Sequence, residues 1–236
     1  MPVKMTPIDN AASDAILVGD PRRAFALAQE LTVQPKMSHL ARGLWGYSGV
    51  TVDGTPLTVQ STGSGGPSAV PVIGDLADQG TGRMIRLGTC LAIDRSLKAG
   101  ALLLVERAVV TDGAGRALSD GADFVQPDQW VFTALEGLGR VATTSSHDLV
   151  ERHEPDGPGR SDPGPAIARD LQTAATLAMC RRVGIPAAAL LIVAEDAAGN
   201  RLGEDELWDL FRSAGRAVLS RLHRLVPPEP NPPAEV

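Results

Sequence analysis

The sequence has few cysteines, no long run of basic residues and no long apolar run, and each shortage excludes a class of protein. Its 236 residues include two cysteines, Cys90 and Cys180, in apolar segments without a CxxC or Cys/His spacing. We therefore expect buried free thiols and a reducing compartment, and neither a disulfide nor a zinc site. The formal net charge is −6 at pH 7. A negative chain without a basic run argues against a nucleic-acid partner.

Apolar runs of membrane-spanning length are missing too. Even Ala187 to Ala194 is too short to cross a bilayer, and no signal peptide is recognisable at Met1. We expect a cytoplasmic protein without a membrane partner. Hydrophobic residues make up 43% of the chain, which fits one large α/β domain, expected over residues 1–226. The proline-rich tail at 227–236 is expected to be disordered.

What the sequence does contain is a glycine-rich turn in the stretch Leu57 to Ser68, LTVQSTGSGGPS. Its β-prone start predicts a strand, and Pro67 suits the first turn of a following helix. Gly63, Gly65 and Gly66 can adopt positive φ and bring backbone N–H groups close to a ligand. Free N–H groups at a helix start attract anions, so the stretch predicts an anion site. A tight turn that only feeds a packed helix is equally compatible with it.

Two further segments place an arginine beside a glycine turn. The apolar run at 15–18 (AILV) predicts a buried parallel strand, and GDPRR follows it, with Asp20 as a helix cap and Pro21 at the first helical position. In the second segment, RLGT, Arg86 lies inside an apolar strand, where a charge requires a functional role or a buried ion pair. Thr89 supplies a hydroxyl at the strand end, where open α/β sheets bind ligands.

Apolar and periodic segments predict the other elements. We expect an arm at 1–13, a hairpin turn at Asp53-Gly54, strands at 84–87, 101–110, 140–146 and 186–193, helices at 129–138, 169–183 and 207–222, and a polar loop at 152–165.

Together GDPRR, STGSGGPS and RLGT, in this order and spacing, resemble the hexameric type of nucleoside phosphorylase, and the last two are most similar to uridine phosphorylase. The resemblance extends from about Ala15 to about Val193. It implies a three-layer α/β/α domain around a central mixed β-sheet. It also implies phosphate-dependent cleavage of the N-glycosidic bond of a nucleoside, which gives a free base and a pentose 1-phosphate. Inorganic phosphate would be the co-substrate without any cofactor, and the chain would self-associate as a dimer or as a hexamer built from three dimers.

The resemblance also assigns a phosphate subsite. Its residues would be Gly19, Arg23, Arg86, Thr89 and, from a neighbouring subunit, Arg42, with Arg86 also catalytic. By composition alone, Arg23 and Arg42 would be surface charges.

The nucleoside subsite implied by the resemblance departs from the family pattern. Its residues would be Thr62, Gly63, Leu149, Leu171 and Gln172. Leu149 stands where the family has a stacking aromatic, and His153 and Pro155 stand where it has the Gln-x-Arg pair that reads uracil. Gln172 replaces the glutamate that grips the ribose hydroxyls, so restoring the charge by Gln172→Glu is expected to raise activity. The choice of base and of sugar stays open.

Acidic and histidine side chains offer two further candidates. Asp196 falls where purine phosphorylases of this type place a catalytic aspartate, although Glu195 and Asp196 are equally compatible with two loop carboxylates before a turn. The cluster His147, Asp148, Glu151 and His153 has metal-ligand residue types but no HExxH spacing, so we predict no metal site.

Two other functions remain compatible with the residues. The first is a catalytically impaired homologue that binds phosphate or a phosphorylated small molecule. The second is a scaffold whose glycine loops only shape turns, and the set of arginines at those turns argues against it.

Overall fold

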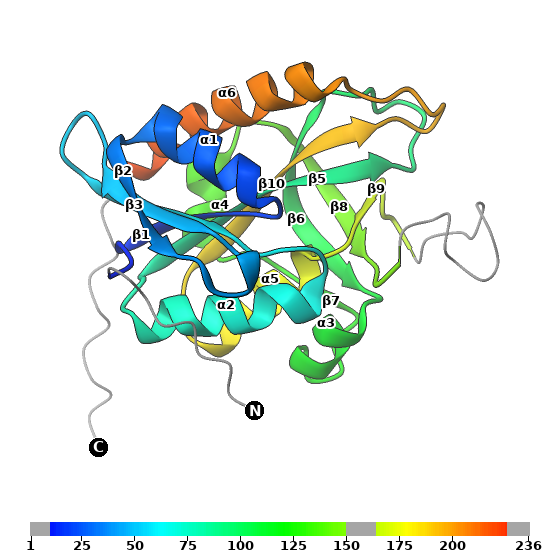
Figure 1. Ribbon diagram of the computed structural model, residues 1–236. Helices are drawn as coiled ribbons and strands as arrows, with labels where there is room; N and C mark the ends of the chain where they lie inside the picture. The colour runs from blue at the N-terminus through cyan, green and yellow to red at the C-terminus, as the bar shows by residue number, and fades with distance from the viewer. Residues whose placement is uncertain (1–9, 150–163, 226–236) are drawn as a thin grey trace.

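A large mixed sheet between two groups of helices forms the centre of the molecule in the computed structural model, which describes residues 10–149 and 164–225 (Figure 1). The strands are β1 (Asp14–Val18), β2 (Val33–His39), β3 (Gly46–Val50), β4 (Pro56–Ser61), β5 (Arg83–Ala92), β6 (Leu102–Val110), β7 (Phe124–Val125), β8 (Arg140–Ser146), β9 (Ala168–Asp170) and β10 (Ala187–Glu195). The helices are α1 (Pro21–Leu31), α2 (Gly66–Asp78), α3 (Gly113–Leu118), α4 (Gln129–Leu135), α5 (Thr173–Arg182), α6 (Glu204–Leu222) and the short 3₁₀ turn η1 (Ala41–Gly43). The predicted tail at 227–236 lies outside the described residues, as do most of the arm and of the loop at 152–165.

Strand β5 is the centre of the sheet. It pairs in parallel with β1 on one side and with β10 on the other, and its last residues pair antiparallel with β9. From β10 the sheet continues through β6 and β8 to β9, so these strands and β5 close into a ring of hydrogen-bonded strands. Strands β1, β4, β3 and β2 extend from β5 as an open part. The mixture of parallel and antiparallel pairs confirms the predicted central mixed sheet.

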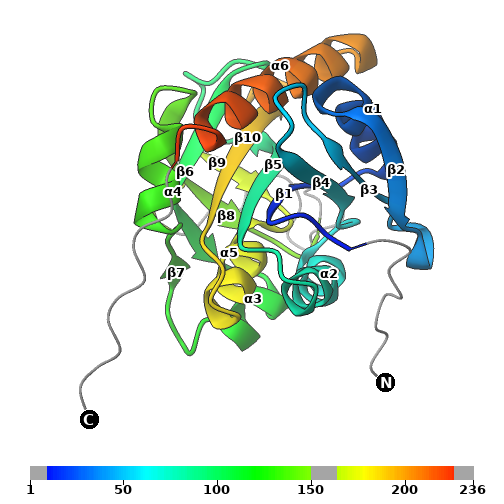
Figure 2. The same cartoon turned by 90° about the vertical axis from the view of Figure 1, so that its left-hand side faces the viewer.

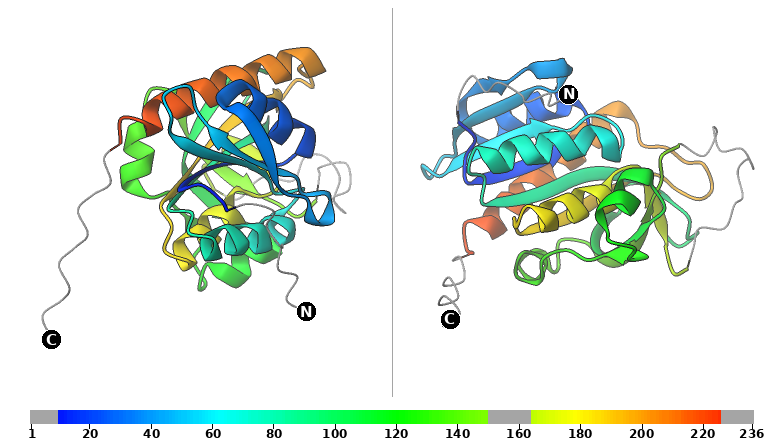
Figure 3. Two further views of the ribbon diagram at one scale, coloured as in Figure 1. Left: turned by 60° about the vertical axis from the view of Figure 1, so that its left-hand side comes forward. Right: turned by 90° about the horizontal axis from the view of Figure 1, so that it is seen from below.

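Helices cover both faces of this sheet and give three layers. Helices α1, α4 and α6 lie on one face, and α2, α3 and α5 lie on the other (Figure 2; Figure 3, right). Successive side chains of β1 enter opposite cores: Ile16 belongs to the core that includes Phe211 of α6, and Leu17 belongs to the core under α2. A strand buried on both faces has no polar face, which explains the uninterrupted AILV run.

Local signals predicted most of these elements correctly. Asp20 caps α1 by accepting a hydrogen bond of 2.7 Å from the backbone N–H of Arg22. The Asp53-Gly54 turn joins β3 to β4, with Gly54 at φ 86°. Cys90 and Cys180 are buried free thiols, as predicted.

The predicted helix at 169–183 is wrong at its start. Arg169 and Asp170 belong to β9, which pairs with β8 and β5, and α5 begins at Thr173. Asp170 accepts hydrogen bonds from the backbone N–H of Thr173, three residues on, in the manner of a cap, so the chain enters the helix only after it.

Strands β2 and β7 and helix α3 were also absent from the sequence-based prediction, and α4 is shorter than predicted. Strand β2 pairs with β3 within the described residues despite Pro35, which an outer strand tolerates. Strand β7 and helix α3 occupy a segment rich in turn-forming residues, and Asp112 caps α3 at the N–H of Gly115. Helix α4 ends at Leu135, just before Gly137 at φ 83°. Among the described residues no helix combines the length and apolarity that a membrane span requires.

Candidate functional site

A cavity of about 610 Å³ lies where the chain leaves β1, β4, β8 and β9 and along β5 from Arg86 to Leu91. Eight of the residues predicted to form the site line it: Gly19, Arg23, Gly63, Arg86, Thr89, Leu149, Leu171 and Gln172. The other three predicted residues do not line this cavity in the described part of the chain; they are Arg42, Thr62 and Asp196. The sheet therefore brings GDPRR, the glycine loop and RLGT to one place.

The glycine loop and the Gly19 turn are held against each other at the ends of β1 and β4. The backbone N–H of Thr62 donates to the carbonyl of Val18 at 2.7 Å, and the hydroxyl oxygen of Thr62 lies 3.1 Å from the same carbonyl oxygen. Gly19 approaches the loop so closely that a Cβ there would lie 3.4 Å from the carbonyl oxygen of Gly63. Gly63 and Gly65 have φ of 70° and 82°, and Gly65 caps α2 without any side chain. The loop needs glycine for this conformation and presents bare backbone to the cavity.

The sequence analysis offered a functional role or a buried ion pair as the reason for a charge at Arg86. The structure agrees with both, because Arg86 lines the cavity and also forms a buried ion pair. Its guanidinium donates to the carboxylate of Asp170 at 2.9 Å, to the amide oxygen of Gln172 at 2.6 Å and to the hydroxyl of Thr173 at 3.0 Å. Only 6% of its side chain is exposed, and none of that of Asp170. These partners compensate for burial of the charge.

Asp170 is a site residue that the sequence analysis missed. Its carboxylate accepts from Arg86, from the N–H and hydroxyl of Thr173 and from the hydroxyl of Ser146, the last at 2.7 Å. Placing Asp170 inside a helix concealed this role. An aspartate three residues before a threonine, ahead of a small-residue helix, is the local capping signal that could have revealed it.

Gln172 lines the cavity, but the protein occupies its whole amide. The amide oxygen accepts from Arg86 and from the hydroxyl of Thr62 at 2.8 Å, and the amide nitrogen donates to the carbonyls of Gly63 and Gly65 at 3.1 and 2.9 Å. This arrangement changes the expectation for Gln172→Glu, since a carboxylate cannot donate to two carbonyls.

Arg23 supplies a second cation to the cavity. Its guanidinium lies 4.7 Å from the centre of the Phe211 ring, and the exposed Arg22 beside it pairs with Asp20 and Glu204. Burial lowers the pKa of Arg23, but an arginine stays protonated at neutral pH. The half-buried guanidinium therefore brings positive charge to the glycine-lined wall.

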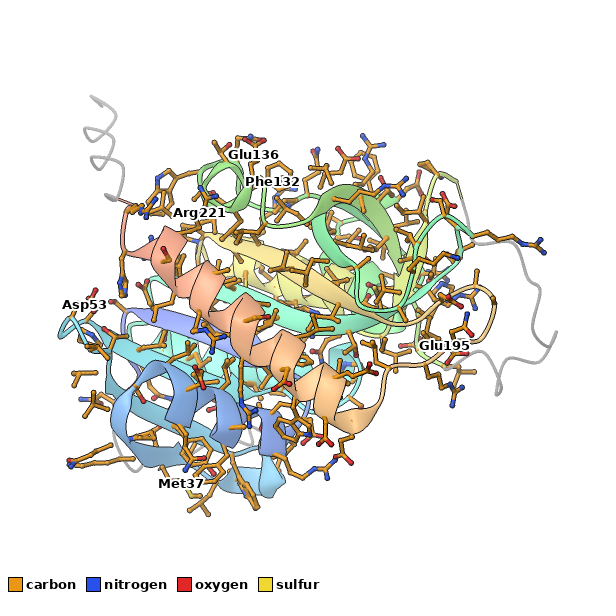
Figure 4. All side chains as sticks on the ribbon, turned by 90° about the horizontal axis from the view of Figure 1, so that it is seen from above. Met37, Asp53, Phe132, Glu136, Glu195 and Arg221 are labelled. Carbon is orange, nitrogen blue, oxygen red and sulfur yellow. The ribbon has the colours of Figure 1, made fainter. Side chains whose placement is uncertain are left out.

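Asp196 and Arg42 stand apart from the cavity lining. The carboxylate of Asp196 accepts from the N–H groups of Ala198 and Asn200 and from the Asn200 side chain, and these bonds, that of the side chain first, lower its pKa. Glu195, labelled in Figure 4, pairs with Arg201 at 2.6 Å. These contacts favour the loop-carboxylate alternative, and a catalytic role of Asp196 stays a prediction.

Arg42 is exposed in η1, at φ 58°. Leu44, two residues further, does line the cavity. A phosphate role for Arg42 requires a neighbouring chain and also stays a prediction.

The rest of the lining mixes apolar and polar side chains, to which the sequence analysis gave no role in this site. It includes Leu44, Leu91, Ala194, His147 and Arg169 beside the predicted Leu149 and Leu171. Among the described residues there is no group of three or more His, Cys, Asp or Glu side chains placed to hold a metal ion. Glu151, His153 and Pro155 lie outside the described residues.

The fold and this cavity define an α/β protein with a glycine- and arginine-lined site. No model of a known protein family matches the chain. A DeoD-type purine nucleoside phosphorylase from Oceanobacillus iheyensis is 32% identical over 114 residues, which are 48% of this chain and 48% of that protein. A guanosine phosphorylase from Halorubrum lacusprofundi is 26% identical over 204 residues, 81% of this chain and 82% of that protein. A DeoD-type purine nucleoside phosphorylase from Bacillus thuringiensis is 26% identical over 193 residues, 78% of this chain and 82% of that protein.

At the level of the superfamily, these similarities confirm the resemblance to nucleoside phosphorylases that the three motifs carry. The match spans about half the length of the Oceanobacillus relative and of a second DeoD-type relative from Clostridium novyi. The similarity to uridine phosphorylase and the hexameric type remain predictions.

Proposed function

We propose that this protein is a nucleoside phosphorylase, which uses inorganic phosphate to split a nucleoside into a free base and a pentose 1-phosphate. The observation that carries the proposal is the convergence of the Gly19 turn, the Gly63–Gly65 loop and Arg86 on one cavity. The names of the similar proteins, all nucleoside phosphorylases, support it. The reaction would use inorganic phosphate as co-substrate and no cofactor, and we place it in the cytoplasm.

The cavity suits the two charged species of this reaction, the phosphate anion and the sugar that becomes cationic. Phosphate would lie against the glycine loops, with Arg23, Arg86 and Thr89 as donors. As the bond between the anomeric carbon and the base breaks, its electron pair leaves with the base and the sugar becomes cationic. A phosphate held close to that carbon stabilises the cation and then forms the new carbon–oxygen bond.

The base would occupy the apolar part of the cavity, between Leu44, Leu91, Leu149 and Leu171. Leucines provide contact area without a hydrogen-bonding pattern specific to uracil. The named relatives are purine and guanosine phosphorylases. We therefore propose a purine nucleoside as the first substrate to test, ahead of the uridine that the motif wording suggested.

We further propose that the chain works as a homo-oligomer. Exposed apolar side chains occur on the consecutive elements that flank Arg42 in sequence: Phe25 of α1, Val33 and Met37 of β2, Leu40 and Trp45 beside η1, and Val50 of β3. Such a surface is typical of a protein contact, and a second copy seated there would cover it. This contact would also give Arg42 a route to a neighbour's phosphate.

A phosphate-binding protein without turnover is the second candidate. It is favoured by the hydrogen bonds of Gln172 and Asp196, whose polar atoms are occupied by the protein itself. Neither side chain would then handle a sugar hydroxyl or a departing base.

Release of free base from purine and pyrimidine nucleosides, with and without phosphate, tests the proposal. We expect release that depends on phosphate and is lost in Arg86→Ala, while Arg116→Ala, at an exposed arginine of α3, serves as the control. Phosphate binding without release from any nucleoside would favour the second candidate. Absence of both binding and release would contradict the proposal.

A further inference from the structure

Gln172 joins three parts of the chain that are far apart in sequence. Its amide contacts Thr62 at the end of β4, the carbonyls of Gly63 and Gly65 in the glycine loop, and Arg86 in β5. The residue is 2% exposed and immediately precedes α5. It therefore connects the glycine loop to Arg86, the two parts of the candidate phosphate subsite that it contacts.

Only an amide satisfies this set of partners. Arg86 can only donate, so the amide oxygen of Gln172 must face Arg86. The two glycine carbonyls can only accept, so the amide nitrogen must face them. Both lone pairs of the oxygen and both N–H groups are occupied. A carboxylate of the same shape would lose two donors and place negative charge against two carbonyl oxygens.

The charge at this corner also depends on the amide. Arg86 and Asp170 form an ion pair of opposite unit charges, to which the neutral Gln172 adds nothing. The lining also contains Arg23 and Arg169 as cations and Asp20 as an anion, so the wall keeps an excess of one positive charge that attracts an anion. A glutamate at 172 would add a negative charge 2.6 Å from Arg86 and oppose a phosphate bound there.

We propose that Gln172 is a positioning residue for the phosphate subsite and does not bind the sugar. By holding the carbonyls of Gly63 and Gly65 it fixes the orientation of two planar peptide units of the glycine loop, and through its oxygen it fixes the guanidinium of Arg86 relative to that loop. The inference rests on the proposed function in that the anion is phosphate. It makes the phosphate subsite preformed before the ligand arrives.

Titration of inorganic phosphate by calorimetry tests the proposal in Gln172→Glu and Gln172→Met, which keep the side-chain length and remove the two donors. Both variants should bind phosphate about tenfold more weakly or worse, the former more so because of its charge. Gln129→Glu makes the same change at an exposed position of α4 and should bind phosphate as the wild type does. In steady-state kinetics the KM for phosphate should rise in both Gln172 variants, while the KM for the nucleoside stays within about twofold.

Thr62→Val provides a second test at a residue outside the cavity lining. The hydroxyl of Thr62 contacts the amide oxygen of Gln172, although Thr62 is not part of the cavity lining. We expect weaker phosphate binding in Thr62→Val than in the wild type. The double variant should bind no more weakly than Gln172→Met alone, because the hydroxyl of Thr62 acts on the subsite through the amide that Gln172→Met already removes.

The outcomes separate this inference from the proposed function. A wild-type protein that binds no phosphate would overturn the proposed function and the inference with it. Wild-type binding that all Gln172 and Thr62 variants share would overturn only the inference. A rise in activity and a lower KM for the nucleoside in Gln172→Glu would show that residue 172 serves the sugar, and would also overturn it.

Discussion

At the scale of single residues, three buried polar side chains of the candidate site have partners that match their chemistry. Arg86, Asp170 and Gln172 combine a cation, an anion and an amide, and each hydrogen-bonding pair joins a donor to an acceptor. Removal of one member leaves the others buried without compensation, which costs more than the lost bond itself. The residues of this site should therefore affect stability as well as binding.

Arg86→Ala should lower both stability and phosphate affinity. The substitution leaves the fully buried carboxylate of Asp170 without its cation, so we expect a loss of about 3–5 kcal/mol in the free energy of unfolding. The double variant Arg86→Ala with Asp170→Asn should recover part of this stability without recovering phosphate binding. Urea unfolding and phosphate calorimetry on the three proteins measure the two effects separately. Equal stability of Arg86→Ala and the wild type would contradict the ion pair.

His39 predicts a loss of stability on mild acidification. Its ring is buried, with Nδ1 3.0 Å from the hydroxyl oxygen of Ser38 and Nε2 3.0 Å from the amide oxygen of Gln79. Burial lowers the pKa of His39 below the ordinary value of 6.5. The folded protein thus binds fewer protons than the unfolded chain just below pH 6.5. The contribution of neutral His39 is complete above 6.5 and declines as the pH falls below it.

Thermal melting between about pH 7 and pH 5 measures this effect. The Tm of the wild type should fall more steeply than that of His39→Asn, which carries no titrating ring. Parallel curves for the two proteins would argue that His39 titrates normally.

At the scale of elements, close contacts between helices decide which glycines can change. Gly215 lies in α6 where this helix crosses α1, and a Cβ there would meet the side chain of Leu27. Gly74 lies in α2, where a Cβ would meet only the flexible end of Met179 at 3.4 Å. The two glycines share a helical backbone and differ in the space around them.

Gly215→Ala should therefore destabilise the protein, while Gly74→Ala should not. Overpacking against Leu27 should cost about 1–3 kcal/mol. At Gly74 the better helix propensity of alanine should give a neutral result or a gain of up to about 1 kcal/mol. Chemical denaturation of both variants gives the comparison, and a stabilised Gly215→Ala would mean that α1 and α6 do not approach this closely.

At the scale of the whole molecule, the cavity depends on the way the sheet is built. Its open part contributes the glycine loop through β4, and its closed part contributes Asp170 and Gln172 through β9 and α5. Strand β5 belongs to both parts and carries Arg86 and Thr89. The site thus lies along the strand that joins the two parts.

The outer surface of the open part predicts self-association. Met37 of β2 is exposed and points away from the body of the molecule in Figure 4. Met37→Glu should weaken assembly, because it places a charge in an apolar contact. Light scattering at micromolar concentration should show an oligomer for the wild type and smaller particles for the variant. An exclusively monomeric wild type would remove the proposed role of Arg42.

The sequence by itself determined the parts of the fold whose signals are local. The cap at Asp20, the glycine turns with positive φ and the apolar strands at β1 and β10 each follow from a few adjacent residues. The order and spacing of the motifs GDPRR, STGSGGPS and RLGT also carried the resemblance to nucleoside phosphorylases. Backbone conformation and burial on both faces restrict the residue types at such positions, so these elements could be read in advance.

Only the tertiary structure decided what the polar residues do. Gln172 and Arg86 are separated by 86 positions and Gln172 and Thr62 by 110, so no local pattern indicates that their side chains meet. Strand β9 is three residues long and owes its conformation to its neighbours in the sheet. A hydrogen bond depends on position in space, and position is set by packing of the whole sheet. The amide at 172 therefore looked like a lost sugar ligand in the sequence, and became the link between loop and arginine in the fold.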